Sequence, residues 1–304
     1  MKAQKKIWMD GKLVPWEDAK IHVLTHGLHY GMAVFEGIRA FHTPKGTAIF
    51  RLDAHLERFM NSAKIYRMEL GYSLKEIAKA CVELVRNNPA KECYIRPIAF
   101  TGYGEMGLNP LTSKVSVAIA SWEWGSYLGD TAKEGIRATI SSWARIDSRA
   151  MPVQAKSAAN YANSGLAKMQ ALTSGFEEAI LLNSEGKVAE GTGENIFRVK
   201  DGILSTPPAT SGILRGITRD TVIQFARDEG ITFYRNDATR EELYTSDEVF
   251  FTGTAAGIAK VREIDGRRIG YDGTPVTDLV SKLYEQATHG KIKKYEKWLT
   301  PVSA

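Results

Sequence analysis

The sequence predicts a mixed α/β (α+β) protein built from two domains. Strand-like and amphipathic helical segments occur in both halves of the chain, a pattern typical of sheets packed against helices. The 304 residues also exceed what one typical core requires. An aromatic, glycine-rich stretch without periodicity, Trp122–Asp130, separates the two halves. We therefore predict a small N-terminal domain over 1–122, an interdomain loop over 123–134 and a larger C-terminal domain over 135–304.

Local patterns predict the elements of the first half. Alternating apolar residues flank Asp10-Gly11, which is a hairpin turn signal. Apolar residues at helical spacing predict a helix over Asp53–Tyr66, and a second helix begins at Ser73, with Glu76 completing a capping box. The predicted strands of this half are Ile7–Met9, Leu13–Val14, Cys93–Phe100 and Lys114–Ser121.

The sequence of the second half predicts further strands and two helices. The helices cover Tyr161–Thr173 and Thr218–Glu229, and glycines at 175 and 230 end them. The predicted strands are Ile136–Ser142, several between Ala179 and Leu204, and Glu248–Thr252, which leads into the turn Gly253–Gly257.

Composition excludes several classes of protein. The chain is 43% hydrophobic and 25% charged, and no apolar run is long enough to span a bilayer. The net charge of +5 is mild, and its densest cluster, Lys291–Lys297, indicates a solvated terminus rather than a nucleic-acid site. Cys81 and Cys93 have the spacing of neither a redox pair nor a metal clip. We expect a cytoplasmic protein with small-molecule substrates and neither nucleic-acid nor membrane partners.

The segment Val188–Phe197 is the most informative stretch of the chain. Gly191 and Gly193 let the backbone approach a flat ligand closely, and Glu190 beside them can pair with a ligand nitrogen. Taken alone, the segment also fits a hairpin with a solvated tip. Of its two acids, we expect Glu194 to be structural and to satisfy the backbone of the turn.

Two other motifs do not form sites. Gly102–Gly107 has the spacing of a dinucleotide fingerprint, but Asn109-Pro110 follows where a helix would have to begin. His22, His26 and His29 have zinc-ligand spacing only if their segment is helical, and Gly27 and Gly31 argue against a helix. We predict no metal site and a structural or pocket-wall role for these histidines.

Two turns are suited to phosphate. Gly216 leads into a predicted helix whose first amide groups have no partner within the helix. Thr218 serves there either as a phosphate ligand or merely as the helix cap. The turn Gly253-Thr254-Ala255 offers a hydroxyl and further backbone donors.

Two basic side chains stand in unusual surroundings. Arg96 shares one face of the strand Cys93–Phe100 with Tyr94, and its planar fork suits a substrate carboxylate, although a surface salt bridge is the default for a lone arginine. Lys156 has small neighbours and no adjacent acid, which allows a buried lysine to act as a nucleophile, although most lysines are solvated surface charges. The lysine, the Glu190 acid, a tyrosine and two phosphate-type turns together describe a site for pyridoxal phosphate.

The sequence resembles the fold-type IV pyridoxal-phosphate enzymes, and among them the branched-chain amino acid aminotransferases. The resemblance covers nearly the whole chain and is highly specific in combination. The motifs that carry it are His29-Tyr30-Gly31, Phe35-Glu36-Gly37-Ile38-Arg39, Tyr94-Ile95-Arg96-Pro97, Lys156 with Asn160-Tyr161, Glu190–Phe197, Gly216-Ile217-Thr218-Arg219 and Thr252-Gly253-Thr254-Ala255.

The resemblance implies roles toward the cofactor, pyridoxal 5′-phosphate. Lys156 matches the catalytic lysine that binds it covalently and transfers the proton at substrate Cα. Glu190 matches the acid that keeps the pyridine nitrogen protonated, and Tyr161 the residue that hydrogen-bonds the ring oxygen. The phosphate-binding positions match Arg58, Ile217, Thr218 and Thr254. The assignment of Arg58 rests on the resemblance alone.

The resemblance also implies a substrate site. Arg96 matches the residue that receives the distal carboxylate of glutamate. The expected substrate-binding residues are Tyr30, Phe35, Gly37, Tyr94, Arg96, Met106, Leu108, Trp124, Tyr127, Thr254 and Ala255. Of these, Tyr30 and the Met106-Gly107-Leu108 loop are expected to come from a partner subunit, which implies a homodimer or a dimer-based homo-oligomer.

The implied activity is transamination of L-leucine, L-isoleucine and L-valine with 2-oxoglutarate, by ping-pong kinetics. The alternatives within the fold are a D-amino-acid transaminase, an (R)-amine transaminase or a lyase that uses the same cofactor. The segments Tyr94–Pro97 and Glu36–Arg39 disfavour them. The sequence departs from its relatives at Leu108, where valine is common, and at Arg215, where proline or an acid is more usual. Neither departure affects the expected chemistry, and Arg215 can strengthen phosphate binding.

Overall fold

The computed structural model describes residues 3–125, 134–270 and 273–302. The chain forms two compact units. Unit 1 contains residues 1–125, 155–159 and 286–304, and unit 2 contains residues 126–154 and 160–285. The predicted interdomain loop, 123–134, falls mostly on residues 126–133, which lie outside the described residues, so the predicted domain limits stay a prediction.

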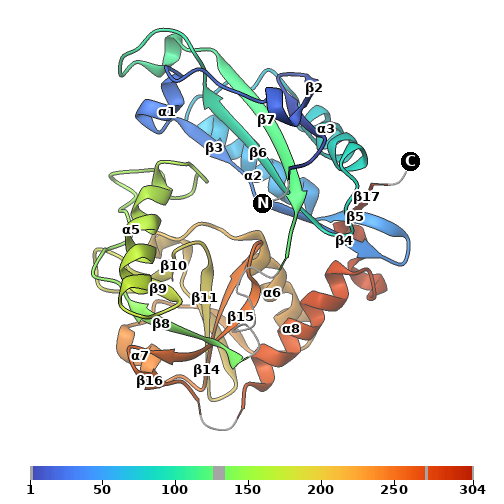
Figure 1. The fold of residues 1–304 in the computed structure, drawn as a ribbon. Coiled ribbons are helices and arrows are strands. Elements are labelled where there is room, and N and C mark those ends of the chain that lie inside the picture. The colour runs from blue at the N-terminus through green and yellow to red at the C-terminus, as the bar shows by residue number, and fades with distance from the viewer. Residues whose placement is uncertain (1–2, 126–133, 271–272, 303–304) are drawn as a thin grey trace. The chain divides into compact units, whose positions relative to one another are not determined.

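Unit 1 is built on an eight-stranded sheet (Figure 1). The strand order is β17-β5-β4-β6-β7-β1-β2, with β3 beside β6, and the pairings of the described strands are antiparallel. The strands are β1 (Lys6–Met9), β2 (Lys12–Pro15), β3 (Ala33–Phe35), β4 (Ile38–Thr43), β5 (Gly46–Phe50), β6 (Cys93–Thr101), β7 (Val115–Glu123) and β17 (Leu299–Pro301).

Two helices, α2 (Leu52–Ile65) and α3 (Leu74–Asn87), supply most of the helical residues in the core of unit 1. The helices of this unit are α1 (His26–Tyr30), α2 and α3. Leu56 and Phe59 of α2 and Leu84 of α3 are fully buried in one cluster with Ile95 of β6 and Ile119 of β7. Because residues alternate along a strand, this packing leaves Tyr94 and Arg96 on the opposite face of β6.

Several predictions for unit 1 are confirmed and one is wrong. The opening hairpin pairs Ile7 with Val14, and Ser73 and Glu76 form the predicted capping box of α3. The expectation that Gly27 and Gly31 prevent a helix is wrong. Gly27 lies inside α1, and Gly31 ends this short helix in the left-handed conformation that glycine adopts readily.

Unit 2 is built on a nine-stranded mixed sheet in the order β10-β9-β8-β15-β14-β11-β12-β13, with β16 beside β15. The strands are β8 (Ile136–Ile140), β9 (Glu178–Leu182), β10 (Val188–Gly191), β11 (Asn195–Lys200), β12 (Ile203–Thr206), β13 (Phe233–Arg235), β14 (Glu248–Gly253), β15 (Gly257–Ile264) and β16 (Arg267–Arg268). The helices are α5 (Asn160–Thr173), α6 (Ile217–Asp228), α7 (Arg240–Tyr244) and α8 (Pro275–Thr288), the last of which continues into unit 1 from Gln286.

The central strands of unit 2 are buried on both faces. On β14, Phe250 packs with α6 and α8, whereas its neighbour Phe251 packs in a separate cluster on the other face. On β9, Leu181 meets the alanines of α5. Such double burial explains why these strands have continuous apolar sequences. The helices predicted over Tyr161–Thr173 and Thr218–Glu229 are confirmed as α5 and α6.

Short 3₁₀ helices complete the described structure at Trp16–Asp18, Pro110–Thr112, Ala209–Ser211 and Lys293–Trp298. The second of them follows Gly102–Gly107, so no α-helix begins where a dinucleotide fingerprint would need one. Among the residues that the structure describes, no helix is both long and apolar enough to cross a membrane.

Candidate active site

The backbone of Lys156 is held as an extra edge partner of β3. Phe35 N donates a hydrogen bond to Lys156 O (2.9 Å), and Ala158 N donates to Ala33 O (2.9 Å). Lys156 N in turn donates to Ser62 Oγ on α2 (3.0 Å). The Lys156 side chain is half-buried, and its Nζ lies 4.9 Å from the centre of the Phe35 ring. The lysine therefore stands on a fixed support beside an aromatic ring.

Arg58, expected to bind phosphate, is held by a buried acid. Glu36 is fully buried, and its two carboxylate oxygens accept hydrogen bonds from Arg58 Nε (2.6 Å) and Nη2 (2.9 Å). Glu36 Oε2 also accepts a hydrogen bond from His55 Nδ1 (2.8 Å). The sequence predictions gave no role to Glu36 or His55.

Arg96 lies among aromatic rings. Its guanidinium carbon is 4.7 Å from the ring centre of Phe35, 5.3 Å from that of Tyr94 and 5.8 Å from that of Trp122. Arg96 Nη2 lies 3.4 Å from the Tyr94 hydroxyl oxygen, and its buried Nε has no hydrogen-bond partner in the described part of the chain. The surface salt bridge, the default for a lone arginine, does not form among the described residues.

Gly37 lies against the same tyrosine. A Cβ built on Gly37 would sit 1.8 Å from the Tyr94 hydroxyl oxygen, so no larger residue fits unless Tyr94 moves. Tyr94 also packs against Trp124, with ring centres 4.6 Å apart. Unit 1 thus brings together Phe35, Gly37, Tyr94, Arg96 and Trp124 of the predicted substrate site.

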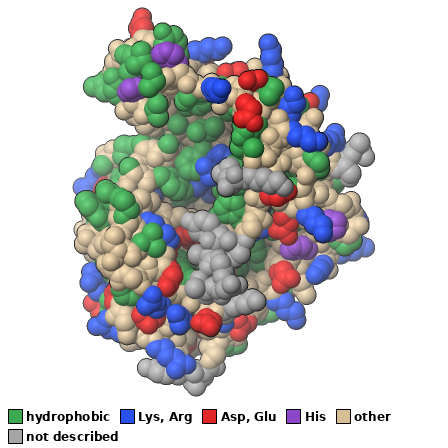
Figure 2. Space-filling view, in the orientation of Figure 1, with side chains coloured by type: hydrophobic (Ala, Val, Ile, Leu, Met, Phe, Trp, Pro, Cys, Tyr) green, Lys and Arg blue, Asp and Glu red, His purple; other side chains and the backbone are tan. Residues whose placement is uncertain are grey.

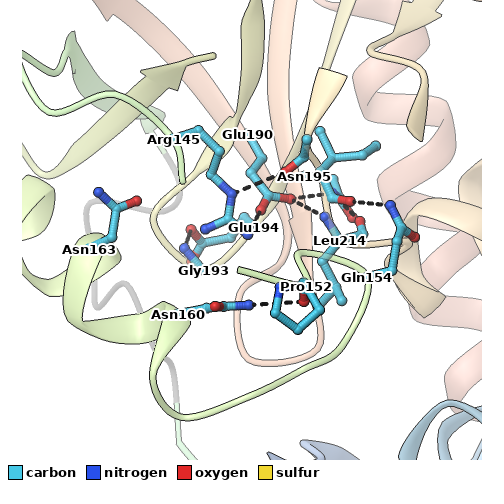
Figure 3. A network of polar contacts seen from close by, with 12 residues as sticks. Arg145, Pro152, Gln154, Asn160, Asn163, Glu190, Gly193, Glu194, Asn195 and Leu214 are labelled. Atoms are coloured by element: carbon cyan, nitrogen blue, oxygen red, sulfur yellow. Dashed lines mark hydrogen bonds and ion pairs between the residues drawn. The ribbon is translucent and has the colours of Figure 1, made fainter. Parts of the chain in front are cut away.

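The Glu190 carboxylate is fixed from two sides (Figure 3). One oxygen, Oε1, forms an ion pair with Arg145 Nη2 at 2.9 Å. The other, Oε2, accepts hydrogen bonds from Asn195 Nδ2 (2.9 Å) and Leu214 N (3.0 Å). All these donors are themselves buried or half-buried. An acid held in this way is an oriented buried anion and not the solvated tip of a hairpin.

The second acid of the turn has a different environment. Glu194 Oε2 accepts a hydrogen bond from Gly193 N (3.0 Å), which is the kind of contact expected of a structural residue. The neighbouring carboxylate of Glu178 accepts hydrogen bonds from Lys168 Nζ (2.7 Å) and from the Thr192 hydroxyl (2.6 Å). Burial, followed by the negative charge of Glu178, raises the pKa of the Glu194 carboxyl to about 8.

Asn195 connects the predicted elements of unit 2. Its side chain binds Glu190, and its backbone lies opposite Thr252, next to the Gly253–Ala255 turn. A Cβ built on Gly216 would sit 2.0 Å from Asn195 Oδ1, so the start of α6 approaches the same residue as closely as glycine allows. The acid, the helix start and the Thr254 turn therefore lie together.

The start of α6 resolves the question about Thr218. Gly216 is the N-cap and no side chain caps the helix, so the interpretation of Thr218 as the cap is wrong. Ile217 and Thr218 are the first two helical residues, whose amide groups have no acceptor within the helix. An uncapped helix start of this kind favours an anion.

Four of the remaining predicted residues belong to the described part of the chain. Tyr161 is half-buried in the first turn of α5, and Tyr127 lies outside the described residues. Tyr30, Met106 and Leu108 are exposed on unit 1, with Leu108 86% exposed. His26 holds this group together because its Nε2 contacts Gly107 O (2.8 Å) and its ring packs on Tyr30.

The comparisons with known proteins point to one family. The sequence model of the family "Amino-transferase class IV" matches residues 33–264. The branched-chain-amino-acid aminotransferase of Pseudomonas aeruginosa PAO1 is 48% identical over 97% of each chain, and that of Escherichia coli K12 is 44% identical over 98% of this chain and 97% of its own.

Solved structures have the same fold. The T.th. branched-chain amino acid aminotransferase with pyridoxamine 5′-phosphate matches 100% of both chains with a TM-score of 0.96 and 49% identity. The branched-chain aminotransferase of the archaeon Thermoproteus uzoniensis with norvaline matches 99% of this chain and 100% of its own, with a TM-score of 0.94 and 47% identity. The predicted fold class is therefore confirmed, and this chain belongs to the class IV aminotransferase family, with the sequence and fold of its branched-chain members.

Proposed function

We propose that this protein transfers the amino group between L-leucine, L-isoleucine or L-valine and 2-oxoglutarate, with pyridoxal 5′-phosphate as cofactor. One observation carries the proposal. The ring of Phe35 lies within 5 Å of both the Lys156 amine, at 4.9 Å, and the Arg96 guanidinium carbon, at 4.7 Å. A substrate that reacts at Lys156 thus places its side chain beside both an apolar ring and a cation, as a site for both leucine and glutamate requires.

The residues present fit the cofactor. The uncapped start of α6 at Gly216 can receive a phosphate through its amide groups, and the close approach of Asn195 leaves room there for glycine only. Glu190 supplies an ordered buried anion suited to a protonated ring nitrogen. Lys156, Tyr161, Arg58 and Thr254 are the other residues that would hold the group. When bound, it supplies an electron sink for the charge that develops at substrate Cα.

The protein's own residues then divide the work. Lys156 Nζ is the base that takes the proton from Cα of the amino-acid substrate in one half-reaction. In the reverse half-reaction it delivers a proton to Cα of the new amino acid. Glu190 keeps its charge oriented through Arg145 and Asn195, so its contribution needs no rearrangement during the reaction. Because Gly37 has no side chain, the Tyr94 hydroxyl lies close to the backbone there. We assign this hydroxyl, together with the Thr254-Ala255 turn, to binding of the substrate α-carboxylate.

Substrate selection follows from the aromatic setting of Arg96. An isobutyl group packs on Phe35, Tyr94 and the tryptophans, whereas a distal carboxylate pairs with the guanidinium. Because the rings already stack on the cation, the charge is not left bare when an apolar substrate is bound. One pocket therefore accepts both substrates of the ping-pong cycle.

We further propose that two copies of the chain act together. Exposed hydrophobic side chains gather over α1 and the loop that follows β6 (Figure 2). They are Val23, Leu24, Leu28, Tyr30, Tyr103, Met106, Leu108 and Leu111. An apolar patch of this kind is typical of a subunit interface, so Tyr30 and Leu108 would reach the site of a second copy. We also place the protein in the cytoplasm, since Cys81 and Cys93 are buried and form no disulfide.

The test uses the absorbance of the bound cofactor. L-leucine should convert the aldehyde form of the purified holoenzyme to the amine form, and 2-oxoglutarate should convert it back. D-alanine should leave the spectrum unchanged. Conversion by D-alanine and not by L-leucine would instead show a D-amino-acid transaminase, and a Lys156→Ala protein that keeps the absorbance band of the lysine-bound cofactor would remove Lys156 from its role.

A further inference from the structure

Glu36 is among the most enclosed charged groups of unit 1. It directly follows β3, where its neighbour Phe35 touches both Lys156 and Arg96, and its side chain turns to α2 and has no exposed surface. Its carboxylate accepts hydrogen bonds from Arg58 and His55, and Gly37 N adds a longer one (3.2 Å). A buried carboxylate is costly unless paired, so this arrangement needs a reason beyond filling the core.

The charges of the group are well defined. Burial alone would raise the pKa of Glu36, but the charge of Arg58 and the hydrogen bond from His55 hold that pKa below its usual range. Burial lowers the pKa of His55, against the opposing effect of Glu36. Glu36 is therefore an anion, Arg58 a cation and His55 a neutral donor whose Nδ1 carries the proton.

The geometry of the pair fixes the plane of the guanidinium. Glu36 takes the edge formed by Nε and Nη2, which is the side-on bidentate edge of arginine. His55 holds the same carboxylate from one turn earlier on α2 and so prevents it from swinging with Arg58. Ser62, one further turn along, receives Lys156 N. One face of α2 thus supports both Arg58 and the lysine segment.

We propose that Glu36, steadied by His55, is a positioning residue that sets the orientation of Arg58 for the phosphate group of the cofactor. This inference rests on the proposed function, in which Arg58 binds that phosphate. A guanidinium already held in its bound orientation loses less conformational freedom when the anion arrives, so affinity rises without a new contact to the ligand.

The experiment compares two ligands that differ only in the phosphate. Apoprotein is titrated with pyridoxal 5′-phosphate and with pyridoxal, and the dissociation constant of pyridoxal divided by that of pyridoxal 5′-phosphate measures how much the phosphate contributes. Glu36→Gln should weaken binding of pyridoxal 5′-phosphate about 10-fold or more and leave pyridoxal within about twofold. Equal losses for both ligands, or no loss, would overturn the inference, because a merely structural role weakens both alike.

A matched control comes from the other unit. Glu248 is also buried, and its carboxylate accepts hydrogen bonds from Val276 N and Thr277 N at the start of α8. Glu248→Gln should leave the ratio of dissociation constants unchanged. If Glu36→Gln does not fold, Glu36→Asp, which keeps the charge but shortens its reach, takes its place with the same expected and contrary results.

A third variant separates this inference from the proposed function. Arg58→Lys should lower the same ratio, because the ammonium lacks the bidentate edge. An unchanged ratio in Arg58→Lys would show that Arg58 does not bind the phosphate, and the proposed role of Arg58 would fail. A lowered ratio in Arg58→Lys together with an unchanged ratio in Glu36→Gln would overturn only the positioning role of Glu36.

Discussion

The surroundings of Arg96 suit the role toward two unlike substrates that we propose for it. Its guanidinium lies over Phe35, Tyr94 and Trp122, while its buried Nε has no partner among the described residues. The rings stabilise the cation when no anion is present, and the unsatisfied N–H favours an incoming carboxylate. Lysine would weaken both effects, because a compact ammonium is more strongly hydrated and has no planar fork.

Removal of the Arg96 charge should slow the half-reaction with 2-oxoglutarate far more than the half-reaction with L-leucine. Arg96→Gln should lower kcat/KM for 2-oxoglutarate about 100-fold, equal to about 2.7 kcal/mol, while the half-reaction with L-leucine changes only a few-fold. Single-turnover absorbance measurements with each substrate give both values. Arg149→Gln, a change to an exposed arginine that pairs with Asp147, serves as the control. Equal losses with both substrates would contradict the assignment of Arg96.

Residue roles that depend on contacts distant in sequence escaped prediction. Arg145 pairs with Glu190, and Glu36 with His55 and Arg58, across stretches whose spacing has no periodic signature. A signal existed for α2, because His55, Arg58 and Ser62 recur at helical spacing beside its apolar stripe. No comparable signal marks Arg145, whose burial results from the packing of unit 2.

At the scale of elements, local chemistry was predictable and packing was not. The hairpin turn at Asp10-Gly11 and the capping box of α3 depend on neighbouring residues, and both are confirmed. The helix α1 was wrongly excluded because glycine is a poor helix former on its own. Its packing requires glycine at position 27, because Gly27 lies tightly against the backbone of Met32 and Thr101, where a side chain would collide. The helix α8 was not predicted, and burial of Val280 helps to hold it.

Glu194, in the turn between β10 and β11, should make the stability of the folded protein depend on pH. The folded-state pKa of Glu194 is raised, so the folded protein keeps a proton that the unfolded chain releases above its ordinary pKa of 4.5. This contribution to stability is full below pH 4.5 and is lost as the pH rises through about 8. Glu194→Gln removes the titration and should therefore become more stable relative to the native protein as the pH rises.

Urea unfolding at pH 5, 7 and 9 measures this difference. We expect the free energy of unfolding of Glu194→Gln to gain on that of the native protein by on the order of 1 kcal/mol or more across this range. Glu69→Gln, which alters an exposed carboxyl, should show no such trend. Parallel curves for Glu194→Gln and the native protein would show that Glu194 ionises normally in the folded state.

At the scale of the whole molecule, the exposed patch of unit 1 allows a test of shared sites. Leu108 is 86% exposed, so Leu108→Glu should leave the fold intact while impairing the site that this loop would enter in a second copy. Lys156→Ala removes the part of the site that each chain would supply to its own site, namely the lysine. Neither protein should be active alone, but subunits assembled from an equal mixture should recover about a quarter of native activity, since half of the dimers are mixed and each has one complete site.

The contrary result of the mixing experiment is equally clear. If Leu108 acts within its own chain, every mixed dimer has one site without the lysine and one with the damaged loop. The mixture would then show only the average of the two parent activities. Size-exclusion chromatography of each variant confirms that the substitutions have not changed the oligomeric state.

The strands of the unit 1 sheet are made at widely separated times during translation. Unit 1 begins with β1, yet one edge strand of its sheet is β17, at Leu299–Pro301, which pairs with β5. Lys156, whose backbone pairs with β3, is made only with residues 155–159. The ribosome therefore releases the outer strand of this sheet only after it has made the strands of unit 2. The sheet that contains β1 is therefore completed only after unit 2 has been made, and a product that stops before residue 155 lacks both an edge strand of this sheet and Lys156.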